Sequence, residues 1–356
     1  MSVIIDTTRH DTTRHYYFDF LRIISAFAVM MLHLASIGYY NSDVNSFEWK
    51  IFNFYHGGLT YWSVPVFVMI SGSLFLSRDI SAKKMFSKYI FRMILAFVFW
   101  SSFYALLLSY LRQQNIADFL SNFIIGHYHL WFLFMITGLY MIVPFMKKIA
   151  ESEQLTKYFL ILALFSAFVI PQSISLCRIF SKQYDYVLGK AFGNFYLSFA
   201  AGFSGYFLAG YFLNTHKITL KHECLIYIAG AAGILISVFL SEYASLNSNM
   251  PVQTFCLPLS IGIMAESIAI FTFCKKHVHQ KLAKSGFIRA LSKYSFGAYL
   301  VHAAVIGILK KIPIVHNMLM SNPLVFLPLT ALIVFIISFS ISALLNHIPV
   351  INRYIV

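Results

Sequence analysis

The sequence contains few charged residues. Asp, Glu, Lys and Arg make up 11% of its 356 positions, and the mean hydropathy is +0.72. Soluble globular proteins carry about 25% charged residues, and the stretches between the apolar runs are too short to form a separate soluble domain. The composition therefore excludes a soluble globular protein and indicates a polytopic membrane protein.

Several catalytic motifs are missing as well. The sequence has no GxSxG, HExxH or P-loop, and no GxGxxG between a strand and a helix. Its cysteines show neither CxxC nor metal-ligand spacing; they are Cys177, Cys224, Cys256 and Cys274. We therefore expect no proteolysis, ATP hydrolysis or dinucleotide chemistry, no metal site and no bound cofactor.

What the sequence does contain is long apolar runs. A membrane-spanning helix needs about 20 apolar residues. The candidate runs are 18–40, 59–77, 86–110, 123–146, 158–176, 193–213, 224–241, 253–274, 294–310 and 323–345. We expect an all-α fold, a polytopic membrane bundle of about ten transmembrane helices over residues 18–346.

The ends of the chain and the loops set the expected topology. Residues 1–17 form a polar tail that holds a tandem DTTRH repeat at 6–15, and residues 347–356 form a short second tail. Most Lys and Arg residues fall in alternate loops on the side of these tails, which by the positive-inside rule places both termini in the cytoplasm. Topology also accounts for the net charge of +14, so we expect no nucleic-acid partner.

The first apolar run, FDFLRIISAFAVMMLHLASIGYY, keeps Asp19, Arg22 and His33. An Arg at a helix centre costs roughly 2.5 kcal/mol or more. Eleven residues separate Arg22 from His33, which is three helical turns plus about 20°, or roughly 16 Å along one face. Arg22 would then lie near the cytoplasm and His33 past mid-membrane, with Asp19 in reach of Arg22.

These residue types suit catalysis on an anionic substrate. The planar fork of Arg22 recognises phosphate or carboxylate, and His33 can act as a general base. The alternative is that Arg22 snorkels to the inner interface and His33 hydrogen-bonds a neighbouring helix. Lys88 and Arg92, one turn apart at the cytoplasmic end of the third run, could clasp an anion together with Arg22, or anchor that helix at the interface.

The later runs contain a few further polar residues. Glu266 and His302 lie inside apolar segments, where each is either functional or the partner of another buried group. His127, His129 and Trp131 open the fourth run, with His129 a candidate acceptor-side group and Trp131 a candidate interfacial aromatic. We treat Glu266, His302, His129, Trp131 and Asp19 as possible supporting residues.

Four segments together resemble the acyltransferase-3 family of membrane acyltransferases. They are an early helix with Arg, ten residues and His, here Arg22 and His33; VPVFVMISGSLFL, whose Ser71 and Gly72 would allow close helix packing; HLWFLFMITGLYMIVP; and YSFGAYLVHAAVI. The resemblance covers nearly the whole chain. The third helix departs from the family's Arg-x-x-Arg, because Tyr89 stands at the first position and Arg92 at the second, with Lys88 beside them.

The resemblance implies a bacterial inner-membrane O-acyltransferase that modifies a surface polysaccharide. Acyl-CoA, usually acetyl-CoA, would be the cytoplasmic donor and co-substrate, and a glycan or a lipid-linked sugar would be the acceptor. Arg22, Lys88 and Arg92 would hold the donor's phosphates by charge-assisted bonds. His33 would take the proton of the acceptor hydroxyl as its oxygen attacks the thioester, in a site poor in water.

Two other functions fit a bundle with intramembrane charges. A transporter or flippase for a lipid-linked sugar or an anion would show internal repeats and broken helices in corresponding halves, and residues 18–176 show no convincing match to residues 193–345. A structural membrane subunit would use Arg22 and His33 only to join helices.

Overall fold

A computed structural model describes residues 16–180, 182–197, 200, 202–278 and 285–356. The predicted tail at 1–17, with its tandem repeat, lies almost entirely outside the described residues. The described part is all-α, with 82% helix and no strand.

The helices of the first half are α1 (Tyr17–Asn41), α2 (Phe47–Asn53), η1 (Phe54–Gly58), α3 (Ser63–Leu76), α4 (Ala82–Lys84), η2 (Met85–Ile90), α5 (Phe91–Arg112), α6 (Ile116–Ile125), α7 (Trp131–Met141), α8 (Val143–Ala150), α9 (Glu153–Ala163), η3 (Leu164–Val169) and α10 (Ile170–Phe180). Those of the second half are α11 (Lys182–Gly193), α12 (Ser204–Thr215), α13 (Leu220–Ser248), α14 (Ile261–His277), α16 (Gly286–Leu309), α17 (Pro313–Ser321), α18 (Pro323–Asn346) and α19 (Pro349–Tyr354). The elements η1, η2 and η3 are π-helical turns inserted next to α-helices.

Six continuous helices in the described part are long and apolar enough to cross a membrane. They are α1, α13, α18 and the composite helices Phe47–Leu76, Ala82–Arg112 and Glu153–Cys177. Two bent pairs, α7 with α8 at 57° and α16 with α17 at 97°, raise the number to eight. These eight correspond to eight of the ten predicted runs.

The other two predicted runs contain shorter helices. In the run 193–213 the structure has α12, with 12 residues, and in 253–274 it has α14, with 17 residues. Helix α14 begins only at Ile261 because residues 251–260, which include Pro258, form an irregular segment. The predicted number of about ten is thus approximate, and helix length supports six to eight spans.

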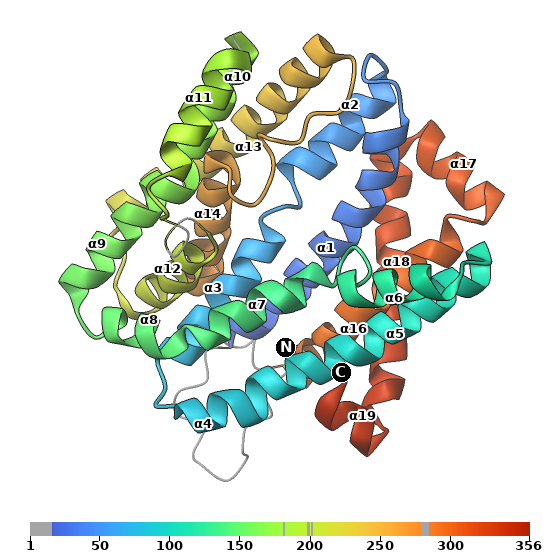
Figure 1. The fold of residues 1–356 in the computed structure, drawn as a ribbon, viewed down its shortest axis with the longest axis horizontal. Coiled ribbons are helices and arrows are strands. Elements are labelled where there is room, and N and C mark those ends of the chain that lie inside the picture. The colour runs from blue at the N-terminus through green and yellow to red at the C-terminus, as the bar shows by residue number, and fades with distance from the viewer. Residues whose placement is uncertain (1–15, 181, 198–199, 201, 279–284) are drawn as a thin grey trace.

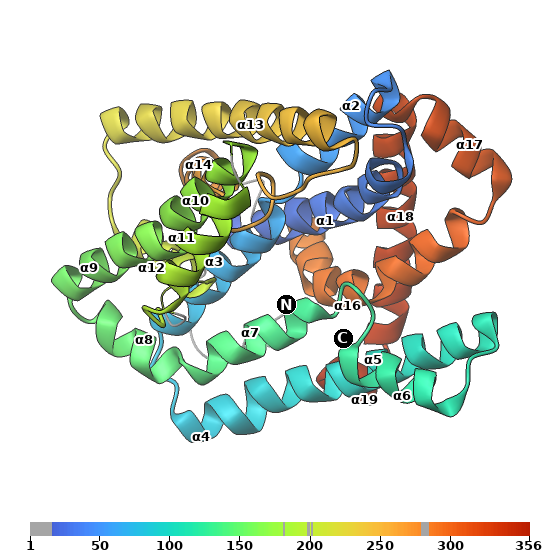
Figure 2. The same ribbon diagram turned by 45° about the horizontal axis from the view of Figure 1, so that its top comes forward.

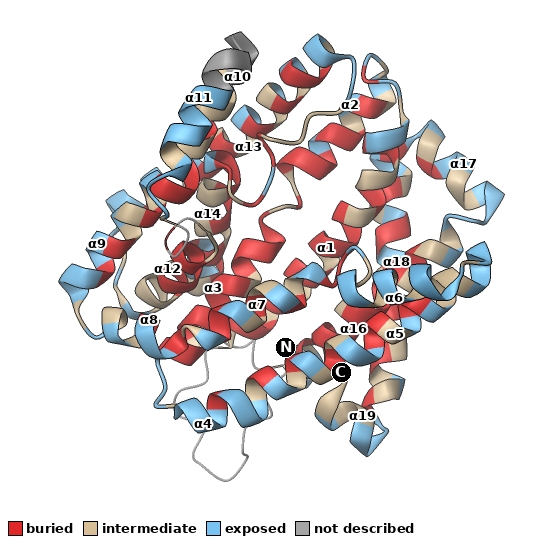
Figure 3. Ribbon diagram, viewed as in Figure 1, coloured by how far each residue is buried: buried red, intermediate tan, exposed pale blue. Residues whose placement is uncertain are grey.

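Helix α1 lies at the centre of the bundle. It packs against α3, α16 and α18, and more lightly against α14. Figure 2 shows α13 along one side of the molecule and α5 along the other, with α1 between them. In Figure 3, α1 and α3 are largely buried while α5 and α9 expose much of their surface. The charged residues of α1 therefore face other helices.

Glycines bring α3 and α12 into close contact. A Cβ atom on Gly72 would lie 1.7 Å from the carbonyl oxygen of Phe207, and one on Gly210 would lie 2.0 Å from the carbonyl oxygen of Met69. Each helix thus places a glycine against the backbone of the other, the arrangement by which membrane helices approach closely. The packing role predicted for Gly72 is confirmed.

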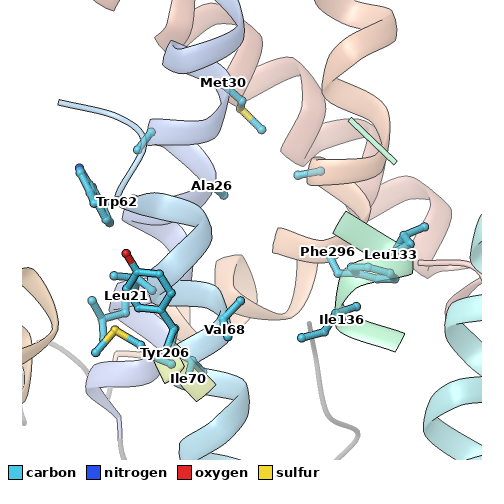
Figure 4. Packing of buried hydrophobic residues seen from close by; sticks show 14 of the residues in the cluster. Leu21, Ala26, Met30, Trp62, Val68, Ile70, Leu133, Ile136, Tyr206 and Phe296 are labelled. Atoms are coloured by element: carbon cyan, nitrogen blue, oxygen red, sulfur yellow. The ribbon is translucent and has the colours of Figure 1, made fainter. Parts of the chain in front are cut away.

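Apolar side chains from several helices fill the space around α1. Figure 4 shows Leu21, Ala26 and Met30 of α1 among them, with Leu133 and Ile136 of α7 beside Phe296 of α16. This apolar packing surrounds the polar face of α1, so the few polar groups there are held away from lipid.

The outer surface of the bundle is apolar as well. On α18, the side chains of Leu329, Leu332 and Ile336 are about half exposed, while Ala331 and Val334 on the opposite face are fully buried. Exposed apolar surface of this extent marks contact with a membrane or a partner. With the length of the helices, it supports a multi-pass membrane protein.

Candidate active site

Arg22 and His33 lie on one face of a continuous helix, α1. Helix α1 runs without interruption from Tyr17 to Asn41, so the geometry expected from the spacing holds: one face, roughly 16 Å between the two positions. Val29 lies between them. It lines one cavity together with Arg22 and a second cavity together with His33.

The inner end of this face holds a buried ion pair. The Arg22 Nη1 atom lies 3.1 Å from Asp19 Oδ1, as the spacing predicted. The Ser292 hydroxyl of α16 donates to the same Asp19 oxygen at 2.7 Å and receives a longer bond of 3.5 Å from Arg22. Arg22 is 8% exposed and Asp19 4%. Taking both charges out of water is tolerated because each has the other and a hydroxyl as partners.

Arg92 and Lys88 have different surroundings: Arg92 contacts distant parts of the chain, and Lys88 is at the surface. Arg92 donates from Nη2 to the carbonyl oxygen of Val356, and its guanidinium lies 5.7 Å from the centre of the Phe296 ring. Phe296 lines the small cavity that also contains Arg22. Lys88 is exposed, and its ammonium lies over the ring of its neighbour Tyr89. Arg92 is thus joined to the Arg22 region through one aromatic ring, while the donor-binding role of Lys88 stays a prediction.

The outer end of the α1 face holds a pair of histidines. The His33 ring of α1 and the His302 ring of α16 have centroids 5.2 Å apart and planes 27° apart. Tyr128 packs edge-on against His33 at 4.9 Å. Within the described residues His33 makes no hydrogen bond to another protein group, and it lines a cavity. His33 is therefore the histidine whose ring nitrogens are available to a ligand.

Backbone contacts fix the tautomer of His302. Its Nδ1 faces the carbonyl oxygen of Tyr299, and a carbonyl oxygen only accepts, so Nδ1 carries the proton. The Nε2 lone pair is buried and has no hydrogen-bond partner in the described part of the chain. His302, fully buried against His33, is thus a neutral imidazole with an unused acceptor.

His129 is held in the opposite tautomer. Its Nε2 lies 3.3 Å from the carbonyl oxygen of Leu300 and so carries the proton. Its Nδ1 then accepts from His127 Nδ1 at 3.0 Å. The Tyr299 hydroxyl donates to the backbone carbonyl of His129. Both ring nitrogens of His129 therefore make hydrogen bonds within the protein. These bonds fix the ring of this predicted acceptor-side residue in the wall of the cavity.

Two adjoining cavities lie along the α1 face. The outer one, about 400 Å³, is lined by His33, Ser36, His129, Trp131 and Tyr299 among others. The inner one, about 30 Å³, is lined by Arg22, Ser71 and Phe296 among others. Four residues line both and form what we call the neck: Val29, Val64, Phe132 and Tyr299. Through these four shared residues the two cavities adjoin, one at Arg22 and the other at His33.

The remaining predicted residues fall into two groups. Trp131 lines the outer cavity, is 41% exposed and packs against Phe203. Glu266 is buried in α14, and its Oε2 has no hydrogen-bond partner among the described residues. No contact in the described part of the chain joins Glu266 to His33 or His302. The structure therefore brings Trp131 to the site and leaves Glu266 apart from it.

Three residues that lack a predicted role also belong to the site. Tyr299 lines both cavities and contacts His129 and His302 through its hydroxyl and its carbonyl. The sequence could have indicated Tyr299, because it stands three residues before His302, one helical turn away, in YSFGAYLVH. Tyr61 and, behind it, His56 lie at the outer cavity, in FYHGGLTYW between two apolar runs. Only their tertiary contacts identify them.

The site shows no arrangement typical of a metal centre. Among the residues that the structure describes, no three His, Cys, Asp or Glu side chains gather closely enough to hold a metal ion. The polar groups on hand are a guanidinium at one end, imidazoles and hydroxyls at the other, and apolar walls between. Such a set can bind an anion and move a proton at a fixed distance from it.

Comparison with known proteins adds one finding. The family model described as an acyltransferase domain, of the acyltransferase-3 family, matches residues 15–346. No match was found to a curated protein or to a solved structure. The matched range contains both cavities and the whole polar face of α1.

Proposed function

Because the chain belongs to the acyltransferase-3 family, we propose that it is an integral-membrane O-acyltransferase of the bacterial inner membrane. In this proposal it moves an acyl group, usually acetyl, from cytoplasmic acyl-CoA to a hydroxyl of a cell-surface polysaccharide or its lipid-linked precursor. The observation that supports the proposal is the pair of adjoining cavities, one lined by Arg22 and the other by His33, which share four wall residues.

The inner end suits the donor. Coenzyme A is a polyanion with a long flexible arm that ends in the thioester. Arg22 lines the inner cavity and Arg92 contacts Phe296 in its wall, so both can meet phosphates by charge-assisted bonds. Lys88, exposed at the same end of the composite helix, would add charge at the entrance. The thioester arm would follow α1 through the neck.

The outer end suits the chemistry. His33 takes the proton of the acceptor hydroxyl as that oxygen attacks the thioester carbonyl, forming a C–O bond. When the C–S bond breaks, the proton on His33 passes to the departing thiolate, so no proton is gained or lost overall. His302, whose ring is fixed by the Tyr299 carbonyl, stacks against His33 and limits how the His33 ring can turn. The apolar neck limits water, which would otherwise hydrolyse the thioester.

A transfer assay tests this function. Membranes with wild-type protein are expected to move label from [14C]acetyl-CoA to membrane glycan, and His33→Ala is expected to lower the rate by about 10²–10⁴-fold, the usual contribution of a general base. His347→Ala is the matched control, because His347 is exposed and lies outside both cavities.

The outcomes separate the alternatives. Equal transfer by wild type and His33→Ala at matched expression would remove His33 from the mechanism. No transfer by wild type, with uptake of labelled lipid-linked sugar into proteoliposomes, would establish the transporter instead. Transfer by purified protein would exclude pure transport.

A further inference from the structure

A second polar group faces the outer cavity from the opposite wall. Tyr61 lines this cavity together with His33, and it stands on the turn between η1 and α3, inside the composite helix Phe47–Leu76. Irregular backbone at membrane depth is tolerated where it is buried in protein or lines a wet cavity. The break in this helix therefore delivers a tyrosine to the cavity.

The Tyr61 hydroxyl is held loosely by its protein neighbours. It lies 3.3 Å from His56 Nε2 and 3.4 Å from Gln253 Oε1, both long for a hydroxyl, whose usual hydrogen bonds are about 2.7–2.8 Å. Tyr40 makes the short bond to Gln253, at 2.5 Å. The Tyr61 hydroxyl can therefore rotate toward a ligand oxygen without losing a strong bond.

His56 behind Tyr61 is buried and incompletely satisfied. It is 1% exposed, it stacks on Tyr39 with centroids 4.1 Å apart, and its Nδ1 has no hydrogen-bond partner among the described residues. The Oδ1 atom of Asn53, close to His56 along the same helix, also has none. Buried polar groups in proteins almost always have partners. Two unsatisfied buried polar atoms therefore lie behind Tyr61.

The backbone here has a feature that often accompanies function. His56 lies in η1, and π-helical turns occur frequently at functional sites. Asn53 and His56, three residues apart along this helix, both lie inside the bundle, where they are 0% and 1% exposed. The Asn53 amide also joins this helix to α13, because its Nδ2 donates to the Val238 carbonyl at 3.1 Å, whereas His56 reaches toward Tyr61 through its Nε2.

The rest of the cavity wall defines the ligand that would use Tyr61. Aromatic rings of Trp131, Phe132, Phe203 and Tyr299 line it, with few polar groups among them. A sugar ring presents C–H groups on its faces and hydroxyls around its edge, so it matches flat apolar walls with a few hydrogen-bonding groups. Ser36 uses its proton on the Leu32 carbonyl, which leaves Tyr61 as the hydroxyl donor of this wall.

We propose that Tyr61, oriented by His56, is the acceptor-positioning residue: it hydrogen-bonds a second hydroxyl of the sugar whose first hydroxyl meets His33. This inference rests on the proposed acyl transfer and deepens it. Tyr61 fixes how the sugar ring is turned in the cavity, and so which hydroxyl is acylated. His56 is a positioning residue that acts through Tyr61.

Steady-state kinetics of purified protein in nanodiscs test the proposal, with [14C]acetyl-CoA as donor and the detergent-extracted glycan fraction of the source membranes as acceptor. Tyr61→Phe is expected to raise the apparent KM for the glycan about 10-fold, the equivalent of one hydrogen bond, with the KM for acetyl-CoA unchanged. Tyr40→Phe is the matched control, since Tyr40 bonds the same Gln253 and does not line the cavity.

Two His56 variants separate positioning from packing. His56→Gln keeps a side-chain acceptor and is expected to retain most glycan affinity, while His56→Phe keeps the ring and is expected to match Tyr61→Phe. The double variant should lose no more than either single variant.

Each outcome decides something. Wild-type transfer with an unchanged glycan KM in Tyr61→Phe would overturn the acceptor role and leave the proposed function standing. A parallel rise in the KM for acetyl-CoA, or a lower melting temperature in detergent, would mark Tyr61 as structural and also overturn it. Absence of transfer by the wild type would overturn the proposed function and the inference together.

Discussion

At the scale of single residues, the polar face of α1 holds two groups that differ in chemical kind. Arg22 carries a permanent charge and forms an ion pair with Asp19 inside the protein. His33 and His302 are neutral-capable rings that are stacked together, and the described residues offer His33 no hydrogen bond. In the proposed reaction, a bound donor would share Arg22 with Asp19, whereas a ligand at His33 would replace no hydrogen bond among the described residues.

The shared role of Arg22 leads to a prediction about Asp19. Asp19→Asn removes the carboxylate that faces the buried Arg22 guanidinium, so it is expected to destabilise the protein by roughly 3–5 kcal/mol, the usual result of breaking a buried ion pair. Thermal unfolding in detergent, followed by loss of the monodisperse peak, measures this.

The double variant Asp19→Asn, Arg22→Gln should recover much of that stability, because no charge is then left unpaired. It should still bind acetyl-CoA poorly in a filter assay. Recovery of donor binding together with stability would show that Arg22 serves the fold alone.

The tautomer of His302 leads to another prediction. His302→Phe keeps an aromatic ring against His33 and removes the Nε2 acceptor, so the kcat of acetyl transfer is expected to fall by about 10-fold or more with the KM for acetyl-CoA unchanged. The pH profile of kcat should also shift, which a mere packing change would not produce. An unaltered kcat and profile would remove His302 from the mechanism.

At the scale of helices, features that depend on nearby residues in the sequence could be predicted, and contacts between distant residues could not. The common face of Arg22 and His33, the Asp19 contact and the packing role of Gly72 depend on spacing within one helix, and all are present. The stacking of His33 on His302 joins positions far apart in the chain, and no periodicity reports it. Likewise, hydropathy predicted a span at 253–274, but Pro258 and its neighbours form an irregular wall of the cavity instead.

Glycine packing gives a prediction for one helix pair. Gly72→Ala would place a methyl carbon 1.7 Å from a backbone oxygen of α12, which cannot be relieved by a side-chain rotation. The overpacking is expected to cost about 1–3 kcal/mol or more and to lower the yield of folded protein in detergent. Gly138→Ala on α7 is the control, because its added carbon would meet nothing within 4 Å and should leave the yield unchanged. Equal yields would contradict the close approach of α3 and α12.

At the scale of the whole molecule, the proposed function depends on which way α1 crosses the membrane. The distribution of Lys and Arg predicts the cytoplasm for the Arg22 end, and the two adjoining cavities lie at Arg22 and at His33. A cytoplasmic donor would reach the Arg22 end only in this orientation.

Cysteine labelling in whole cells measures that orientation. In a background without the native cysteines, Ala117→Cys on α6 is expected to react with a membrane-impermeant maleimide in intact cells, and Lys83→Cys on α4 only after lysis. Both positions are exposed, so reactivity reports the side of the membrane. The reverse pattern would invert the topology and place the donor end of α1 outside.

Tyr299 couples the two ends of the site. Its side chain lines the neck, and its backbone carbonyl holds the Nδ1 proton of His302. Anything that displaces Tyr299 to enter the neck also moves the group that sets the ring of His302. Occupation of the neck and orientation of the imidazole are therefore thermodynamically linked, and by reciprocity each alters the free energy of the other by the same amount. In the proposed reaction, such linkage predicts that a thioester in the neck and an acceptor at His33 change each other's dissociation constant by the same factor.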